Sequence, residues 1–189
     1  MRTMSDATTI LKSELGSGER LIWAGQPRQG TIFRPSEIFM TPFALLWGGF
    51  AFFWEWQVIQ KGAPAFFVLF GIPFVLIGIY LIAGRFILEA KQRERTYYGV
   101  TNERVLIISG LLGRKIKSLS LHNLSDLSLT EGSNGEGSVL FGSGAPFSSW
   151  FSGFSAWPGM DAYMAPRFDL IPNAKSVYNT IRNAQRSAT

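Results

Sequence analysis

The chain of 189 residues contains no cysteine, and His122 is its only histidine. The lack of cysteine excludes disulfides and thiolate metal ligands, and it is compatible with a reducing compartment. A serine nucleophile would have no other histidine to serve it, and the sequence contains no Gly-x-Ser-x-Gly motif. A metal site at His122 would need carboxylates, of which only Asp126 follows closely. We therefore expect no catalytic residue, no metal site and no cofactor.

Charged residues are also absent from two long apolar runs, residues 38–54 and 65–84. Crossing ~30 Å of hydrocarbon takes roughly 20 apolar residues in a helix. The second run has this length, and the first reaches it by extending through residues 55–59. The pair predicts a two-helix transmembrane hairpin over residues 35–90, with a buried hairpin of a soluble protein as the alternative. The lack of charge inside the runs argues against a proton relay or a transport path.

Small residues predict that the two helices pack closely. Ala44, Gly48 and Ala51 form a ridge on the first helix, and Gly71 and Gly78 share a face of the second. Small side chains allow helix backbones to approach each other in a membrane.

Positive charges flank the hairpin on one side only. They are Arg20, Arg28 and Arg34 before the hairpin, and Arg85, Lys91, Arg93 and Arg95 after it. The connecting turn carries only Lys61. The positive-inside rule then places both termini in the cytoplasm of a multi-pass protein of the bacterial inner membrane. No cleavable signal peptide is expected, because residues 1–18 lack a continuous apolar core.

The net charge of +5 has two readings, an anionic membrane surface or nucleic acid. We favour the inner leaflet, because many of the cations flank the apolar runs. No helix-turn-helix pattern, zinc-ligand spacing or interleaved basic and aromatic pattern indicates nucleic acid.

The hydrophobic period changes after Lys91, where short alternating segments separated by turn residues predict strands. The expected strands are residues 97–100, 104–109, 115–121, 126–130, a segment around Val139 and Phe141, and residues 167–171. A phase slip between Ile116 and Leu119 predicts a bulge near Ser118. A helix is expected after Asn173, with apolar residues on one face. The prediction is an α+β membrane protein whose residues 91–189 form a small antiparallel barrel capped by a C-terminal helix, after a cytoplasmic segment 1–34.

Several short motifs resemble those of a known family. Residues 19–27 (ERLIWAGQP), two apolar runs, residues 97–105 (YYGVTNERV) and the turn 111–114 (LLGR) resemble bacterial membrane proteins with a pleckstrin-homology-like domain, in their two-span form. The resemblance runs from about Glu19 to Ala184. It implies a PH-like β-barrel closed by a C-terminal helix at the cytoplasmic face of the membrane, with no established enzymatic activity. It does not imply phosphoinositide binding, because residues 101–104, which we align with the basic loop of eukaryotic relatives, are short and weakly charged.

Two candidate contact sites follow from the sequence. Arg114, Lys115 and Lys117 are candidate contacts for anionic lipid headgroups, with ordinary solvated charges as the alternative. The insertion at residues 143–166 is rich in aromatic residues and carries one charge, so it either docks on a partner or the membrane interface, or completes the core. Its candidate contact residues are Phe147, Trp150, Phe151, Phe154 and Trp157.

The function expected is a membrane-tethered binding or scaffold module. Its expected partners are the lipid bilayer, anionic headgroups, and a protein partner or a second copy of the chain, and no nucleic acid. An accessory subunit of a membrane enzyme or transporter is the alternative.

Overall fold

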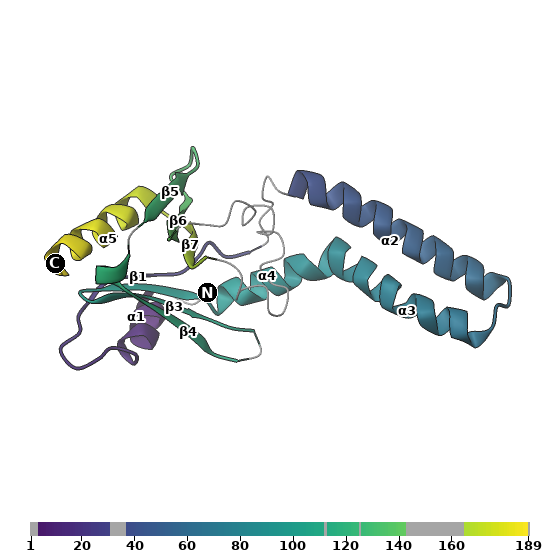
Figure 1. The fold of residues 1–189 in the computed structure, drawn as a ribbon, viewed down its shortest axis with the longest axis horizontal. Helices are drawn as coiled ribbons and strands as arrows, with labels where there is room; N and C mark the ends of the chain where they lie inside the picture. Colours follow the sequence, from purple (N-terminus) through teal and green to yellow (C-terminus); the bar gives the residue numbers. More distant parts are fainter. Residues whose placement is uncertain (1–3, 31–36, 112, 125, 143–164, 189) are drawn as a thin grey trace.

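The computed structural model describes residues 4–30, 37–111, 113–124, 126–142 and 165–188. A helical hairpin extends from one side of two small sheets, and the C-terminal helix lies on the other side (Figure 1). In chain order the elements are α1 (Met4–Lys12), β1 (Leu21–Gly25), α2 (Glu37–Gln60), α3 (Ala65–Ile79), the π-helical turn η1 (Tyr80–Gly84), α4 (Arg85–Glu94), β2 (Tyr97–Thr101), β3 (Arg104–Ser109), β4 (Lys115–Ser120), the 3-10 turn η2 (Leu121–Asn123), β5 (Leu127–Glu131), β6 (Gly137–Phe141), β7 (Arg167–Ile171) and α5 (Ala174–Ala188).

The strands form two antiparallel sheets, in the orders β1-β2-β3-β4 and β5-β6-β7. The strands and the helix expected between residues 97 and 188 are confirmed. Among the described residues the two sheets do not close into a barrel, so that part of the prediction is wrong. Side chains join the sheets instead. The rings of Tyr98 and Phe168 stack with centroids 4.6 Å apart, and the Asp169 backbone N–H donates to the Tyr98 hydroxyl at 3.1 Å.

The predicted bulge near Ser118 is also wrong, because β3 and β4 pair in regular register with Ser118 opposite Leu106. The phase slip has another cause, which is that the edge strand β4 carries apolar side chains on both of its faces and only Leu119 of the two is packed in the main core, whereas Ile116 is 41% exposed. Ile116 lies opposite Ile108, on the face that packs against α1, and Leu119 lies opposite Val105, in the main core.

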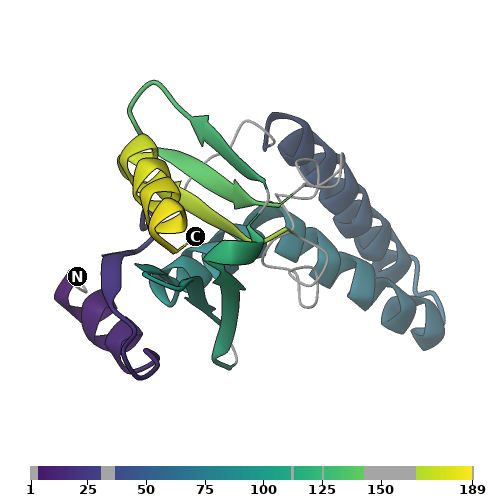
Figure 2. The same ribbon diagram turned by 60° about the vertical axis from the view of Figure 1, so that its left-hand side comes forward.

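The main core lies between the two sheets and α5. In Figure 2, α5 lies in front of the second sheet, and it contacts strands of both sheets. Its core face carries the residues expected from helical spacing, Ala174, Val177, Ile181 and Ala184, all of them buried. This amphipathic packing fixes α5 across the sheets.

The N-terminal residues belong to the folded domain, a role that the sequence analysis did not foresee. β1 pairs with β2, and α1 covers the outer face of the first sheet, where Leu11 is fully buried. The helical hairpin is therefore inserted into the connection between β1 and β2. Residues 101–104 join β2 to β3, so our alignment of them with a loop between the first two strands is wrong.

Helices α2 and α3 pack side by side (Figure 1). The predicted close contact through small residues is confirmed at Gly48 and Gly78, where a Cβ added to Gly78 would lie 3.0 Å from the Gly48 Cα. Ala44 and Ala51 are buried at the same interface, 2% and 5% exposed. The second helix continues through η1 into α4, which leads directly to the sheet.

Candidate functional site

The hairpin exposes an unusually apolar surface. Leu46 and Phe50 on α2 are 76% and 66% exposed, and Phe66 and Leu69 on α3 are 69% and 65% exposed. Exposed apolar side chains of this size recur along both helices. Contiguous exposed apolar surface marks a site of interaction with a membrane or a protein.

Within the described part of the chain, one helical run is long and apolar enough to cross a membrane, Ala65–Glu94. Only 17% of its most apolar 18-residue window is buried. A core helix of a soluble protein would be mostly buried, and within the described residues this window is not.

Three charged residues are buried along one face of α4, at the base of the hairpin. Glu89 and Arg93 form an ion pair at 3.1 Å, and the Arg93 Nη2 donates to the Gly30 carbonyl at 2.8 Å. The Arg85 Nη2 donates to the Thr41 hydroxyl of α2 at 3.3 Å. These contacts tie α4 both to α2 and to the segment that follows β1. The hairpin is thereby joined to the domain by more than a single linker.

A second ion pair lies in the domain itself. The Glu19 carboxylate accepts bonds of 2.8 Å from the Arg104 Nε and Nη2, one of 2.8 Å from the Thr101 hydroxyl, and one of 2.7 Å from the Gly16 N–H. The bond with Arg104 is the main reason that the pKa of Glu19 is lowered to about 2. The same bond raises the pKa of Arg104. Glu19 and Arg104 belong to the motifs behind the family resemblance, and here they hold β1 and β3 in register with β2.

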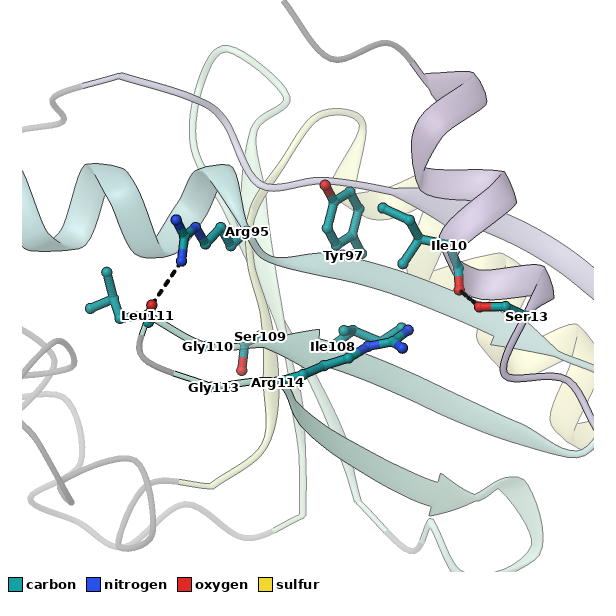
Figure 3. Close-up of a pocket in the computed structure, with 10 residues that line it drawn as sticks. All are labelled: Ile10, Ser13, Arg95, Tyr97, Ile108, Ser109, Gly110, Leu111, Gly113 and Arg114. Carbon is teal, nitrogen blue, oxygen red and sulfur yellow. Dashed lines mark hydrogen bonds between the residues drawn. The ribbon is translucent and has the colours of Figure 1, made fainter.

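A pocket of about 590 Å³ lies between α1 and the turn that joins β3 to β4 (Figure 3). We call it the α1 pocket, and it is lined by Ile10, Ser13, Arg95, Tyr97, Ile108, Ser109, Gly110, Leu111, Gly113 and Arg114. The Arg95 Nη1 donates to the Leu111 carbonyl at 2.8 Å, and the Arg114 Nη2 lies 2.8 Å from the Glu14 carboxylate. The pocket therefore has a cationic side chain at each end.

The structure separates the three predicted lipid-contact residues. Arg114 lies on the α1 side of the first sheet, where it pairs with Glu14. Lys117 lies opposite Ile107, which faces the main core, and Lys115 lies two residues before it on the same strand. The three side chains therefore do not form one continuous patch. Contact of each with lipid stays a prediction, and the aromatic candidates at residues 147, 150, 151, 154 and 157 lie outside the described residues.

Arg95 was not among the predicted site residues. The strand pattern could have indicated Arg95. A hairpin of residues 97–101 and 104–109 brings the residue before the first strand and the turn after the second strand to the same edge of the sheet. As for metals, the described residues contain no group of three or more His, Cys, Asp or Glu side chains that could hold an ion. His122 is exposed in η2.

Two antiparallel sheets of four and three strands, crossed by a C-terminal helix, define a PH-like α+β domain. The chain belongs to the family described as Bacterial PH domain, which it matches over residues 57–184, about two thirds of its length. The matched residues run from the last turn of α2 through most of α5, and they leave out α1, β1 and most of α2. Comparisons with curated proteins and with solved structures gave no match.

Proposed function

We propose that the chain is a membrane-anchored binding module, in which both α2 and α3 cross the bacterial inner membrane and the PH-like domain lies at its cytoplasmic face. The exposed apolar surface of the hairpin carries this proposal. Burying one large apolar side chain contributes about 1.5–3 kcal/mol, and many such side chains are exposed on the two helices. Transfer of this surface from water into the hydrocarbon of a bilayer is therefore strongly favourable.

The lengths of the helices support two crossings. α2 has 24 residues, which at 1.5 Å each span about 36 Å. α3 and η1 together run from Ala65 to Gly84, about 30 Å of helix. Both lengths match a hydrocarbon core of ~30 Å.

The charges support the orientation. The connection between α2 and α3 carries only Lys61, whereas α4 carries Arg85, Lys91 and Arg93 beyond the apolar run. Cations concentrate on the cytoplasmic side of membrane proteins, so the hairpin tip lies outside and the domain inside.

The domain then presents its surfaces to a protein partner or to anionic lipid, without a need for catalytic residues. Lys115 begins β4, at the edge of the sheet where α4 ends and β2 begins. A lysine at this edge can reach anionic headgroups with its flexible side chain. The predicted aromatic contacts of residues 143–166 remain part of the proposal.

Alkaline carbonate extraction of membranes from expressing cells tests the anchor. The natural chain should stay in the pellet, and the double variant Leu46→Arg with Leu69→Arg should be lost from it, because arginine at the centre of a span is costly. Ile22→Arg is the matched control, because Ile22 is 49% exposed on β1 in the domain. Release of the natural chain into the carbonate supernatant would overturn the proposal.

A further inference from the structure

We infer that the α1 pocket binds a phosphate ester, with Arg95 and Arg114 as its anion-binding side chains. Phosphate binding as such stands on the pocket alone. The case that the ester is a membrane lipid headgroup rests on the proposed membrane anchor.

The charge of Arg95 is the first observation. Its Nη1 donates to a neutral backbone carbonyl, that of Leu111, and no carboxylate of the described residues lies within ion-pair distance. A guanidinium carries five N–H donors in a planar fork that suits phosphate oxygens. The cation at this end of the pocket is therefore held in place without being neutralised.

Arg114 is the second observation. Glu14 binds its Nη2 at 2.8 Å and so orients the side chain, which is 51% exposed. Neither aspartate nor glutamate occurs among the ten residues that line the pocket. An anion that enters meets the guanidinium of Arg95 and that of Arg114, which keeps donors free for it beside its single contact with Glu14.

The walls between the cations are the third observation. Figure 3 shows Arg95 beside Leu111 at one end, Arg114 reaching toward Ile10 and Ser13 at the other, and the ring of Tyr97 between them. Ile10, Ile108 and Leu111 add apolar surface. The volume of about 590 Å³ exceeds the needs of a bare phosphate and falls in the range of small-molecule pockets. An ester with a glycerol or larger organic part fits this lining.

The pocket lies at the edge of the sheet nearest the hairpin. α4 ends at Glu94, Arg95 follows, and Tyr97 pairs with Ile108 at the end of β3 that leads into the turn. The ten residues of α4 span about 15 Å, whereas the headgroup layer is roughly 5–8 Å thick on each side. A lipid headgroup therefore reaches the pocket only if α4 runs obliquely to the bilayer, whereas a soluble ester has no such constraint.

Calorimetric titration of the full chain in nonionic micelles separates these sources. The probes are dioctanoyl phosphatidylglycerol, glycerol 3-phosphate, and dioctanoylglycerol as the phosphate-free control. Binding of either phosphate probe should weaken about tenfold or more in Arg95→Gln and in Arg114→Gln, because each removes a charged donor. Ser13→Asp should also weaken phosphate binding, because the new carboxylate lies at an exposed position of the pocket wall while both arginines remain. Arg182→Gln, an exposed arginine on α5, should change binding less than about twofold.

Binding of the lipid without binding of glycerol 3-phosphate would identify a headgroup site, and comparable binding of both would identify a soluble ester. Either result supports the pocket. Absence of binding by both phosphate probes, equal binding of dioctanoylglycerol, or unchanged affinity in both arginine variants would overturn it. If the protein resists carbonate extraction but binds neither phosphate probe, only the phosphate site is refuted. If carbonate releases the protein but it binds glycerol 3-phosphate, only the membrane anchor is refuted.

Discussion

Arg104 holds the carboxylate of Glu19 through two hydrogen bonds of 2.8 Å, although 85 residues separate the two in the chain. The Glu19 side chain is 1% exposed, and that of Arg104 is 30% exposed. The helical hairpin lies between them in sequence. The pair therefore joins the segment before β1 to β3, which lie on either side of the inserted helical hairpin in the chain.

Glu19→Gln should destabilise the domain substantially. The change keeps the shape of the side chain but leaves the Arg104 guanidinium, which is 30% exposed, without its charge partner, so the cost should be about 1–3 kcal/mol. Thermal unfolding of the full chain in micelles, followed by circular dichroism, measures the effect. Arg28→Gln is the control, because it breaks the exposed pair with Glu136 and should cost under about 1 kcal/mol. Equal effects of the two changes would contradict the structural role of Glu19.

The same pair predicts how stability depends on pH. The pKa of Glu19 is about 2 in the folded chain, against an ordinary value of 4.5. A lowered folded pKa stabilises the fold fully above the unfolded pKa, and this contribution is lost as the pH falls from about 4.5 toward 2. Melting midpoints between pH 6 and pH 3 should therefore fall more steeply in the natural chain than in Glu19→Gln. Parallel curves would refute the assignment.

Two adjacent glycines of α2 should respond differently to the same substitution. A Cβ on Gly48 would lie 2.6 Å from the Ile82 Cδ1, whereas a Cβ on Gly49 meets no atom within 4 Å. Gly48→Leu should force α2 and α3 apart and lower the thermal midpoint of the full chain by several degrees, because tight helix contacts do not accept added volume. Gly49→Leu should leave it nearly unchanged. The packing described here is wrong if both variants behave alike.

The absence of cysteine makes topology directly measurable. A cysteine at position 60, replacing Gln60 at the end of α2, should react with an impermeant thiol reagent in intact cells. One that replaces Ser187 near the C-terminus should react only after the cells are permeabilised, because the cations place both termini inside. The opposite pattern of labelling would invert the proposed orientation.

Trp150 and Trp157 test the aromatic insertion. If the insertion is a contact surface, replacing both with Ser should leave the melting temperature of the full chain nearly unchanged and reduce crosslinked partners recovered from native membranes. A loss of several degrees would show instead that these side chains complete the core. The full chain is needed, because β1 belongs to the first sheet.

Local patterns in the sequence predicted much of the fold, and the structure explains where they failed. Strands β2 to β7 follow from short apolar or alternating segments between turn residues, and α5 follows from one apolar face. α1 was missed because Ala7 and Leu11 are two apolar residues four apart, a pattern that means little until Tyr97, Leu106 and Ile108 provide the surface they cover. The bulge was mispredicted because Ile116 and Leu119 lie on opposite faces of β4, where Leu119 packs against the main core and Ile116 stays 41% exposed on the α1 side.

The sequence by itself determined the two apolar helices, the small residues on one face of each, the strand segments and the C-terminal helix, because each depends on neighbours within a few residues along the chain. Only the tertiary structure decided that β1 joins the sheet across the hairpin, that the sheets stay separate among the described residues, and that Arg114 faces away from Lys117. It also brought Ile10, Arg95 and Arg114 around one pocket. These relations depend on strand order and on which face each element buries, and contacts between residues far apart in the chain set both.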